Sequence, residues 1–546
     1  MIKIPQCYYY PGHHIFDIDT KGKGMAETWR PKPADKSVRP RRLKPYRLRR
    51  VLGIPGLFGI GYGHVGSSIY YALGVIAVVA LGATPITLGI AGIIYVLNAV
   101  TYSEGSSMIT EGGGSSAYAR LAFNDLVGFI SAWALLLSYI ATVAIAAYTI
   151  PPYLSYFWPA ISQPITGTLM SMGVIVVLII INVIGIGEIS GVNIVIVTID
   201  IVVLIALIII GLIVLMIPNP GILVEHMFGA GNWPSFENLI FGVAIAALCF
   251  TGVESIAQHS EETRQPEKKV PQTYIIMVIT MLFLFAGITL VALTAMTPQE
   301  LGTQPGGEIG RWARSPVAGI ANSISESIKE VDILNGIDPG GTGAISTPVL
   351  TTIGNLLPGF IAALATAILL MATNTGILGI SRLTYNLSKN RQLPAIMNRI
   401  HYRFRTPYLS VVLFGSLAII FLIPGFTSSR LFIDMAALYV FGSLLVFALA
   451  HGSIIRLRQT KPELPRPIKI WGNVKIGGHK FPITAILGLV LTCIIWLIVM
   501  IGRPYALWGG LTWLVVGFLI YFVYRKSQRL SLSVIGNTKA KRPGDK

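Results

Sequence analysis

Long apolar runs recur along almost the whole chain and are separated only by short polar stretches. A helix that crosses a bilayer needs about 20 mostly apolar residues, and the sequence offers about twelve such runs. Hydrophobic residues make up 53% of the 546 residues, and charged residues make up only 12%. A water-soluble chain of this length would not stay in solution with that balance. The sequence therefore predicts a single all-α polytopic membrane protein.

Hydropathy places these spans. The first six lie near Gly53–Leu81, Pro85–Ile109, Asn124–Leu154, Gly167–Ile186, Val192–Ile217 and Phe236–Ala257. The other six lie near Gln272–Ala295, Leu350–Leu387, Pro407–Ile423, Phe432–His451, Pro482–Ile501 and Tyr505–Tyr524. A long loop, Thr297–Ser346, separates the seventh and eighth spans, and we expect a short helix in it around Val317–Lys329. The basic stretch Ser381–Arg405 suits an interfacial helix.

Basic residues divide unevenly between the two sides of these spans. With a cytoplasmic N-terminus, only five of the 42 Lys and Arg fall outside: Arg311, Arg314, Lys329, Arg430 and Arg503. Lys and Arg collect in cytoplasmic loops. We therefore expect an even number of spans in the plasma membrane, with both termini in the cytoplasm.

The first fifty residues are polar and basic and contain no apolar signal region, so they are neither a signal peptide nor a span. The net charge of +18 would suit nucleic acid, but the basic stretch Lys36–Arg50 abuts the first span. In that place basic residues set topology and meet anionic lipid headgroups. We expect lipid contact and no nucleic-acid binding.

Signatures of cofactors and catalysis are missing from the sequence. Cys7, Cys249 and Cys493 lie too far apart for a disulfide framework or a zinc spacing. Gly61–Gly66 fits G-x-G-x-x-G, but no strand precedes it. No nucleophile, base and orienting group share a plausible spacing. We expect no metal, no cofactor and no enzymatic activity.

Glycine placement is the informative feature within the spans. The first span contains Gly59-Ile-Gly-Tyr-Gly-His-Val-Gly-Ser-Ser68, and the sixth contains Phe250-Thr-Gly-Val-Glu-Ser255. Paired interruptions in the two halves of a chain indicate an inverted-repeat transporter and mark its binding site. Backbone groups freed at such breaks need a ligand, an ion or a neighbouring helix as partner. We therefore predict a small-solute site near the membrane midplane.

Four ordered motifs resemble those of the amino acid, polyamine and organocation (APC) superfamily. The first-span glycine segment is similar to G-x-G-x-x-x-G-S-G-I-F, and Tyr102–Arg120 resembles its Y-A-E-L, P-E-A-G-G-S and Y-A-R signature. Phe250–Ala257 followed by Glu261, Glu262 and Pro266 matches F-T-G-F-E-S-I-A and E-E-x-x-x-P. Gly379–Arg382 and Leu393-Pro394 follow in the same order.

This resemblance implies a leucine-transporter-type fold of five plus five inverted helices with two more at the end, in which helices 1 and 6 are discontinuous. It implies secondary transport of amino acids or related amines by alternating access, coupled to protons or sodium ions, with protons favoured. We divide the chain accordingly into a basic N-terminal tail (1–50), a transport core (51–455), a cytoplasmic loop with helices 11 and 12 (456–524) and a basic C-terminal tail (525–546).

The resemblance also implies the binding residues. The carboxylate of the substrate would meet the backbone of the first break, and its amino group and side chain would lie against the sixth. The residues that match the family's motifs are Val65, Gly66, Ser67 and Ser68 in the first break and Phe250, Thr251, Gly252 and Glu254 in the sixth.

Two positions depart from the family pattern. Ser68 replaces a glycine, and His64 replaces a small apolar residue. Val65–Ala72 also resembles the S-S-x-x-Y stretch of the KUP and KimA-type potassium importers, although these carry an acid where His64 stands. A potassium importer is therefore the alternative function.

Five residues are candidates for coupling or gating. Ionisable groups at membrane depth are costly and functional by default. Asp200 stands where several proton-coupled family members have a lysine, and would carry the proton or bind a cation; the alternative is a neutral acid hydrogen-bonded to a hydroxyl. Glu254 is either a coupling group or a structural carboxylate. His64 is either a pH-sensitive gate or a hydrogen-bonding filler.

The remaining two candidates lie at the edges of the predicted site. Glu104 stands near the cytoplasmic end of the second span, where we expect it to form an inner gate or an ion-paired loop with Glu111 and Arg120. Tyr71 is a candidate to occlude the site, although packing is the commoner role of such an aromatic residue.

Overall fold

A computed structural model describes the part of the chain that lies within the compact unit Leu48–Lys546. The described ranges are 50–185, 190–250, 252–302, 310–337, 347–401, 403–404, 406–428, 431–469, 471–476 and 479–532. Thr251, one of the predicted binding residues, lies outside them. All structural statements below concern the described residues.

Ten helices in this part of the chain are long and apolar enough to cross a membrane, so the protein is a multi-pass membrane protein. The α-helices in these spans are α2 (Ala72–Ala80) with α3 (Thr84–Met108), α5 (Asp125–Leu154), α6 (Pro164–Ile184), α7 (Ser190–Gly211), α11 (Pro266–Ala295), α14 (Thr347–Lys389), α15 (Tyr408–Phe421), α16 (Leu431–Thr460), α17 (Ile483–Gly502) and α18 (Pro504–Ser527). Proline occupies the first turn of several, where its missing N–H costs no hydrogen bond.

The first and sixth expected spans consist of shorter pieces. The first comprises α1 (Ile54–Val65), the 3-10 helix η1 (Gly66–Tyr70) and α2. The sixth comprises α9 (Phe236–Ala246), the 3-10 helix η5 (Ala247–Phe250) and α10 (Glu254–Gln258). The regular α-helical hydrogen bonding thus changes at the two glycine-containing segments that the sequence singled out.

Shorter elements connect the spans. They are α4 (Ser115–Ala122), α8 (Ile222–Phe228), α12 (Pro298–Leu301), α13 (Pro316–Ile337), the π-helical turn η4 (Leu212–Met216) and the 3-10 helices η2 (Leu81–Ala83), η3 (Pro159–Ser162), η6 (Ser260–Glu262), η7 (Ala395–Asn398) and η8 (Ile423–Phe426). The helix expected around Val317–Lys329 is present and longer, as α13. The eighth span continues without a break into the basic stretch that begins at Ser381, because α14 extends to Lys389.

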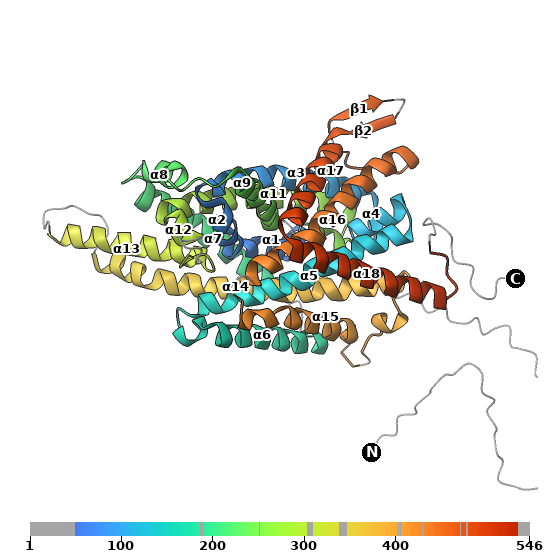
Figure 1. Cartoon of the computed structure of the whole chain (residues 1–546), viewed down its shortest axis with the longest axis horizontal. Coiled ribbons are helices and arrows are strands. Elements are labelled where there is room, and N and C mark those ends of the chain that lie inside the picture. The colour runs from blue at the N-terminus through green and yellow to red at the C-terminus, as the bar shows by residue number, and fades with distance from the viewer. Residues whose placement is uncertain are drawn as a thin grey trace, which may run out of the picture. The chain divides into compact units, whose positions relative to one another are not determined.

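One antiparallel hairpin departs from the all-helical expectation. Strand β1 (Asn473–Ile476) pairs with β2 (His479–Pro482), and Asn473 lies opposite Pro482. Figure 1 shows this hairpin projecting beside the ends of α16 and α17. It belongs to the predicted loop between the tenth and eleventh spans.

Helix α5 lies at the centre of the packing. It contacts α14, α16, α6 and α18. Of its most apolar 18-residue stretch, 94% is buried inside the protein, against 22% for that of α18. Trp133 of α5 and Trp513 of α18 stack, and each indole N–H donates to the other residue's backbone carbonyl, at 2.7 and 2.8 Å. The exposed apolar side chains of α17 and α18 suit contact with lipid.

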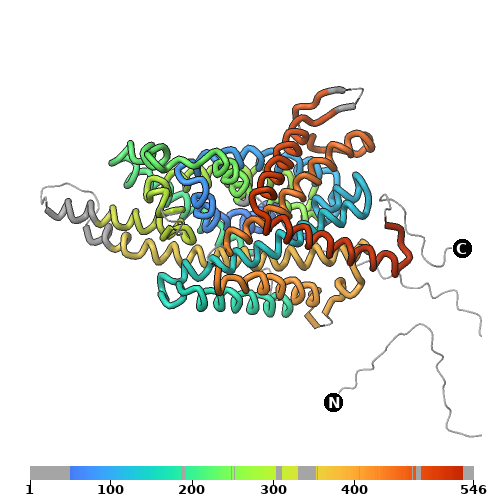
Figure 2. Tube along the Cα trace, in the orientation of Figure 1, coloured from blue at the N-terminus to red at the C-terminus, as the bar shows by residue number. Residues whose placement is uncertain are grey.

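Helix α1 lies among four other helices, α7, α10, α11 and α14. Figure 2 shows the blue tube of the first span beside the green tube of the sixth, and the 3-10 helices η1 and η5 contact each other. The fold therefore brings together two segments that are far apart in the sequence.

Candidate functional site

The first break is a tight 3-10 turn whose serines bond to its own backbone. Ser67 Oγ donates to the His64 carbonyl at 3.1 Å, and Ser68 Oγ lies 2.5 Å from the Val65 carbonyl. Gly66 is required here, because a Cβ would come within 2.6 Å of the Tyr62 ring. The predicted residues Val65, Gly66, Ser67 and Ser68 all lie in this turn and are buried.

The sixth break turns at Gly252. Its φ of 101° belongs to the left-handed region that favours glycine, and a Cβ there would come within 2.2 Å of His64 Cδ2. The N–H of Gly252 donates to Glu254 Oε2 at 3.0 Å. Glycine thus allows both the backbone turn and the close approach of the His64 ring.

The two breaks contact each other directly. Ser68 Oγ lies 3.0 Å from the carbonyl oxygen of Cys249, at the end of the sixth-span segment η5. The neighbouring Phe250 stacks on Tyr95 at a centroid distance of 5.0 Å and meets Phe285 edge-on at 5.0 Å. The binding residues predicted on the two spans, apart from Thr251, are therefore neighbours around one point.

Asp200 reaches this region from α7. Its side chain is fully buried, and it accepts hydrogen bonds from the hydroxyls of Tyr62, at 2.7 Å, and Tyr70. Tyr62 lies before the first break and Tyr70 ends it, so one carboxylate joins the two sides of the break. The hydroxyl of Tyr153 donates to the Tyr70 carbonyl at 2.6 Å and adds a further support.

Several buried polar atoms around Glu254 have no hydrogen-bond partner among the described residues. They are Glu254 Oε1, both ring nitrogens of His64, the Tyr95 hydroxyl and, three residues after Tyr95 on α3, Asn98 Oδ1. Tyr95 lies close enough to Glu254 for a direct electrostatic interaction. Native proteins rarely leave such atoms unpaired, so this group points to a place for a ligand, an ion or water.

Aromatic rings pack against two residues of the first span, His64 and Tyr71. Tyr139 meets the His64 ring edge-on at 5.3 Å, and Tyr71 meets Phe432 edge-on at 5.8 Å. His64 is 3% exposed and Glu254 is 1% exposed. Both side chains are therefore buried in this conformation.

Glu104 has partners that the sequence analysis did not name. Its carboxylate accepts from Arg458 Nε at 2.8 Å and also pairs with Arg458 Nη2, and Arg466 Nε lies 3.6 Å away. Glu111 and Arg120 pair with each other instead, at 2.5 Å. The expected grouping of Glu104 with Glu111 and Arg120 is therefore wrong, because the end of α16 lies nearer to Glu104.

Further ion pairs hold the same end of the helices. Arg382 on α14 pairs with Glu262 at 3.1 Å and contacts His259, and Lys389 lies 3.9 Å from Glu261. The backbone carbonyl of Glu262 also accepts a hydrogen bond from the backbone N–H of Leu52 at 3.0 Å. These contacts connect the chain before α1, the segment after α10 and the end of α14.

Sequence reasoning missed Tyr62 as an Asp200 partner and Arg458 and Arg466 as Glu104 partners. Tyr62 lies within the glycine segment and Tyr70 just after it, which is the one signal that pointed to them. Nothing in the sequence separates Arg458 or Arg466 from the other basic residues of the loops.

Comparisons with known proteins identify the family of this chain. The family model described as amino acid permease matches residues 52–523. The branched-chain amino acid permease BcaP of Bacillus subtilis is 23% identical over 509 residues, covering 89% of this chain and 95% of the relative. The methylthioribose transporter of the same bacterium is 25% identical over 512 residues, covering 89% and 96%. The mouse large neutral amino acids transporter small subunit 2 is 26% identical over 501 residues, covering 87% and 81%.

Proposed function

Because this chain belongs to the amino acid permease family, we propose that it is a secondary transporter of amino acids or related amines that works by alternating access. The observation that carries the proposal is a group of buried polar atoms, where the two breaks meet, that have no hydrogen-bond partner among the described residues. Glu254 offers a carboxylate oxygen without a described partner there, and His64 offers two ring nitrogens. The relatives are named as an amino acid permease, an amino acid transporter and a methylthioribose transporter, which supports a small polar solute.

The proposed substrate lies across the two breaks. Its amino group would pair with Glu254 in the space beside Tyr95 and Asn98, and its carboxylate would meet the first break around Val65–Ser68. Thr251 completes the proposed site from the sixth span. The proposed fold is a five-plus-five inverted repeat, in which the segments at η1 and η5 are the corresponding discontinuities.

We propose proton coupling through Asp200. A proton on this carboxylate would change its hydrogen bonds to Tyr62 and Tyr70, and these residues lie on opposite sides of the first break. Binding of a proton would therefore act on the segment that holds the substrate. His64 would act as a gating residue through its contact with Gly252, and Tyr71 as part of the cover.

The end that carries Glu104 is proposed to face the cytoplasm and to act as the inner gate. Leaving one member of a buried ion pair without its partner is costly. Opening this end therefore requires that the ion pairs of Glu104 and Glu262 break together, or that water hydrates the separated charges. The excess of Lys and Arg on this side supports plasma-membrane insertion with both termini cytoplasmic. Reporter fusions at the two termini and in the loop before α13 test this orientation.

Uptake into proteoliposomes tests the transport proposal. The experiment presents each labelled amino acid, a set of amines, methylthioribose and rubidium-86 as a potassium tracer, with and without imposed proton and sodium gradients. We expect accumulation of at least one amino acid or amine, driven by the proton gradient. Accumulation of rubidium alone would instead establish the potassium importer and contradict our proposal.

Two variants place the function at the site. Glu254→Gln should reduce uptake at least about tenfold, which corresponds to about 1.4 kcal/mol. Glu237→Gln is the matched control, because Glu237 is exposed on the same span, and it should leave uptake unchanged. Asp200→Asn should abolish accumulation while it leaves solute exchange intact. Unaltered concentrative uptake by Asp200→Asn would remove Asp200 from the coupling mechanism.

A further inference from the structure

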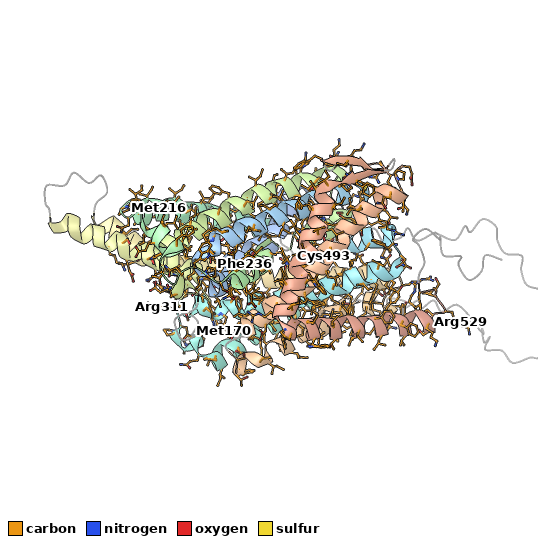
Figure 3. All side chains as sticks on the ribbon, turned by 45° about the horizontal axis from the view of Figure 1, so that its top comes forward. Met170, Met216, Phe236, Arg311, Cys493 and Arg529 are labelled. Carbon is orange, nitrogen blue, oxygen red and sulfur yellow. The ribbon has the colours of Figure 1, made fainter. Side chains whose placement is uncertain are left out.

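A separate cavity of about 380 Å³ lies at the opposite end of the helices from the Glu104 ion pairs. Its walls come from the end of α5, the start of α6, the turn before α13 and the first half of α14. Figure 3 labels Arg311, which lines the cavity, and Arg529, and the two lie at opposite ends of the helices. The volume falls in the range of small-molecule sites, about 300–1,000 Å³.

The cavity has an unbalanced charge. Arg311 and Arg314 line it, whereas no Asp or Glu is among its lining residues. Neither arginine forms an ion pair with a described residue. The guanidinium of Arg311 lies 4.7 Å from the centroid of the Trp312 ring, which also lines the cavity. Arginine beside an aromatic ring is suited to holding a carboxylate through two parallel hydrogen bonds.

The turn that carries both arginines is held firmly. The N–H of Trp312 donates to the Glu300 carbonyl at 3.0 Å. The backbone of Ala313 lies so close to Gly74 of α2 that a Cβ there would come within 1.9 Å of the Ala313 oxygen. Preorganised groups of this kind bind with less loss of conformational entropy than groups on mobile loops.

Tyr153 connects the cavity to the buried site. It lines the cavity, and its hydroxyl donates to the carbonyl of Tyr70, which in turn donates to Asp200 through its own hydroxyl. Tyr153 alone therefore separates the cavity from Tyr70, the residue that ends the first break.

We propose that this cavity is a second binding site, in which Arg311 and Arg314 hold the carboxylate of a small zwitterionic or anionic solute before it enters the buried site. Tyr148, Tyr156 and Trp312 supply apolar walls for the rest of the solute. The role as a capture site rests on the proposed transport function, whereas binding of a carboxylate does not. The outer site would hold the carboxylate first, and the buried site would then hold both the amino group, at Glu254, and the carboxylate, at the first break.

Binding to detergent-solubilised protein tests the site without transport. The probes are 4-methylpentanoate, which is leucine without its amino group, and 3-methylbutylamine, which is leucine without its carboxylate. Tryptophan fluorescence follows the titration, with Trp312→Phe identifying the signal from the cavity. We expect 4-methylpentanoate to bind wild type and Glu254→Gln alike, and Arg311→Gln with Arg314→Gln to weaken this binding at least about tenfold.

Two controls separate the site from general effects of charge or misfolding. Lys329→Gln removes a positive charge from α13, the helix that follows the turn with the two arginines. Lys329 does not line the cavity, so this variant should leave binding unchanged. Arg311→Lys with Arg314→Lys keeps the charges and should bind with intermediate affinity. Equal binding by the Gln double variant, or an equal loss in Lys329→Gln, would overturn the proposal. Binding of phosphatidylglycerol vesicles, with no binding of 4-methylpentanoate, would assign the cavity to a lipid headgroup. That outcome would also overturn the proposal.

Transport kinetics then test the capture role. With an amino acid that wild type accumulates, the Gln double variant should raise the half-saturating concentration at least about tenfold and leave the maximal rate unchanged. An unchanged half-saturating concentration would contradict capture. If wild type accumulates no solute, the proposed function fails, and the fluorescence titration still decides whether the cavity binds carboxylates.

Discussion

Asp200 and Glu254 are both carboxylates buried inside a membrane protein, but their surroundings differ. Both oxygens of Asp200 are taken by tyrosine hydroxyls. Glu254 uses Oε2 for the N–H of Gly252 and leaves Oε1 without a described partner. Buried carboxylates need compensation, and Asp200 obtains it within the fold. The difference indicates that Asp200 organises the first break, while Glu254 has the free capacity for a ligand.

Removing Asp200 should have the largest effect on stability. Asp200→Ala leaves the hydroxyls of Tyr62 and Tyr70 buried without their acceptor, at about 1–3 kcal/mol for each. Glu254→Ala removes one hydrogen bond and one unpaired oxygen, so its cost should be clearly smaller. Thermal unfolding of both variants in the same detergent measures the difference. Equal losses would break the comparison between the two carboxylates.

Gly252→Ala should have the next largest effect. Alanine is strained at a φ of 101°, and its Cβ would displace the His64 ring, which together costs on the order of 2 kcal/mol. In a His64→Ala background the steric part of the loss should disappear and the backbone part should remain. A double-mutant cycle on thermal stability and uptake measures this coupling. Simple additivity would show that His64 does not press on the sixth break.

The two tyrosines test whether Asp200 joins the sides of the first break. Tyr62→Phe and Tyr70→Phe each remove one hydrogen bond to the carboxylate, and each should cost about 1–2 kcal/mol. Because they share one acceptor, the double variant should deviate from the sum of the single losses. Tyr156→Phe, with the ring 53% exposed, is the matched control and should cost nothing measurable.

The smallest effect is expected at the contact between the breaks. Ser68→Ala removes the hydrogen bond to the Cys249 carbonyl, at about 0.6 kcal/mol, the average for such bonds in a membrane protein. Ser67→Ala is the matched control, because the Ser67 hydroxyl bonds to the His64 carbonyl of its own turn. Ser68→Ala should also alter the rate of exchange, whereas Ser67→Ala should not. Identical exchange rates would show that the contact does not couple the two breaks.

Much of the fold could be predicted because the signal is local. The expected spans other than the first and the sixth each coincide with a long described helix, since about 20 consecutive apolar residues identify a span without any knowledge of its neighbours. The glycine clusters likewise pointed to the two places where regular α-helix stops. The β1–β2 hairpin was not expected, because it is a short pair of strands inside a polar loop and carries no comparable pattern.

The candidate site was predictable only in its residues. The sequence alone determined that this chain crosses the membrane many times, that its first and sixth spans contain glycine-rich polar segments, and that Asp200 and Glu254 are costly groups inside apolar segments. Only the tertiary structure decided their partners. The Asp200 bonds join residues 130 and 138 positions apart, and the Glu104 pairing joins residues 354 positions apart. Hydropathy and local motifs depend on neighbouring residues, whereas a hydrogen bond depends on where packing places two side chains, and helix packing sets that placement.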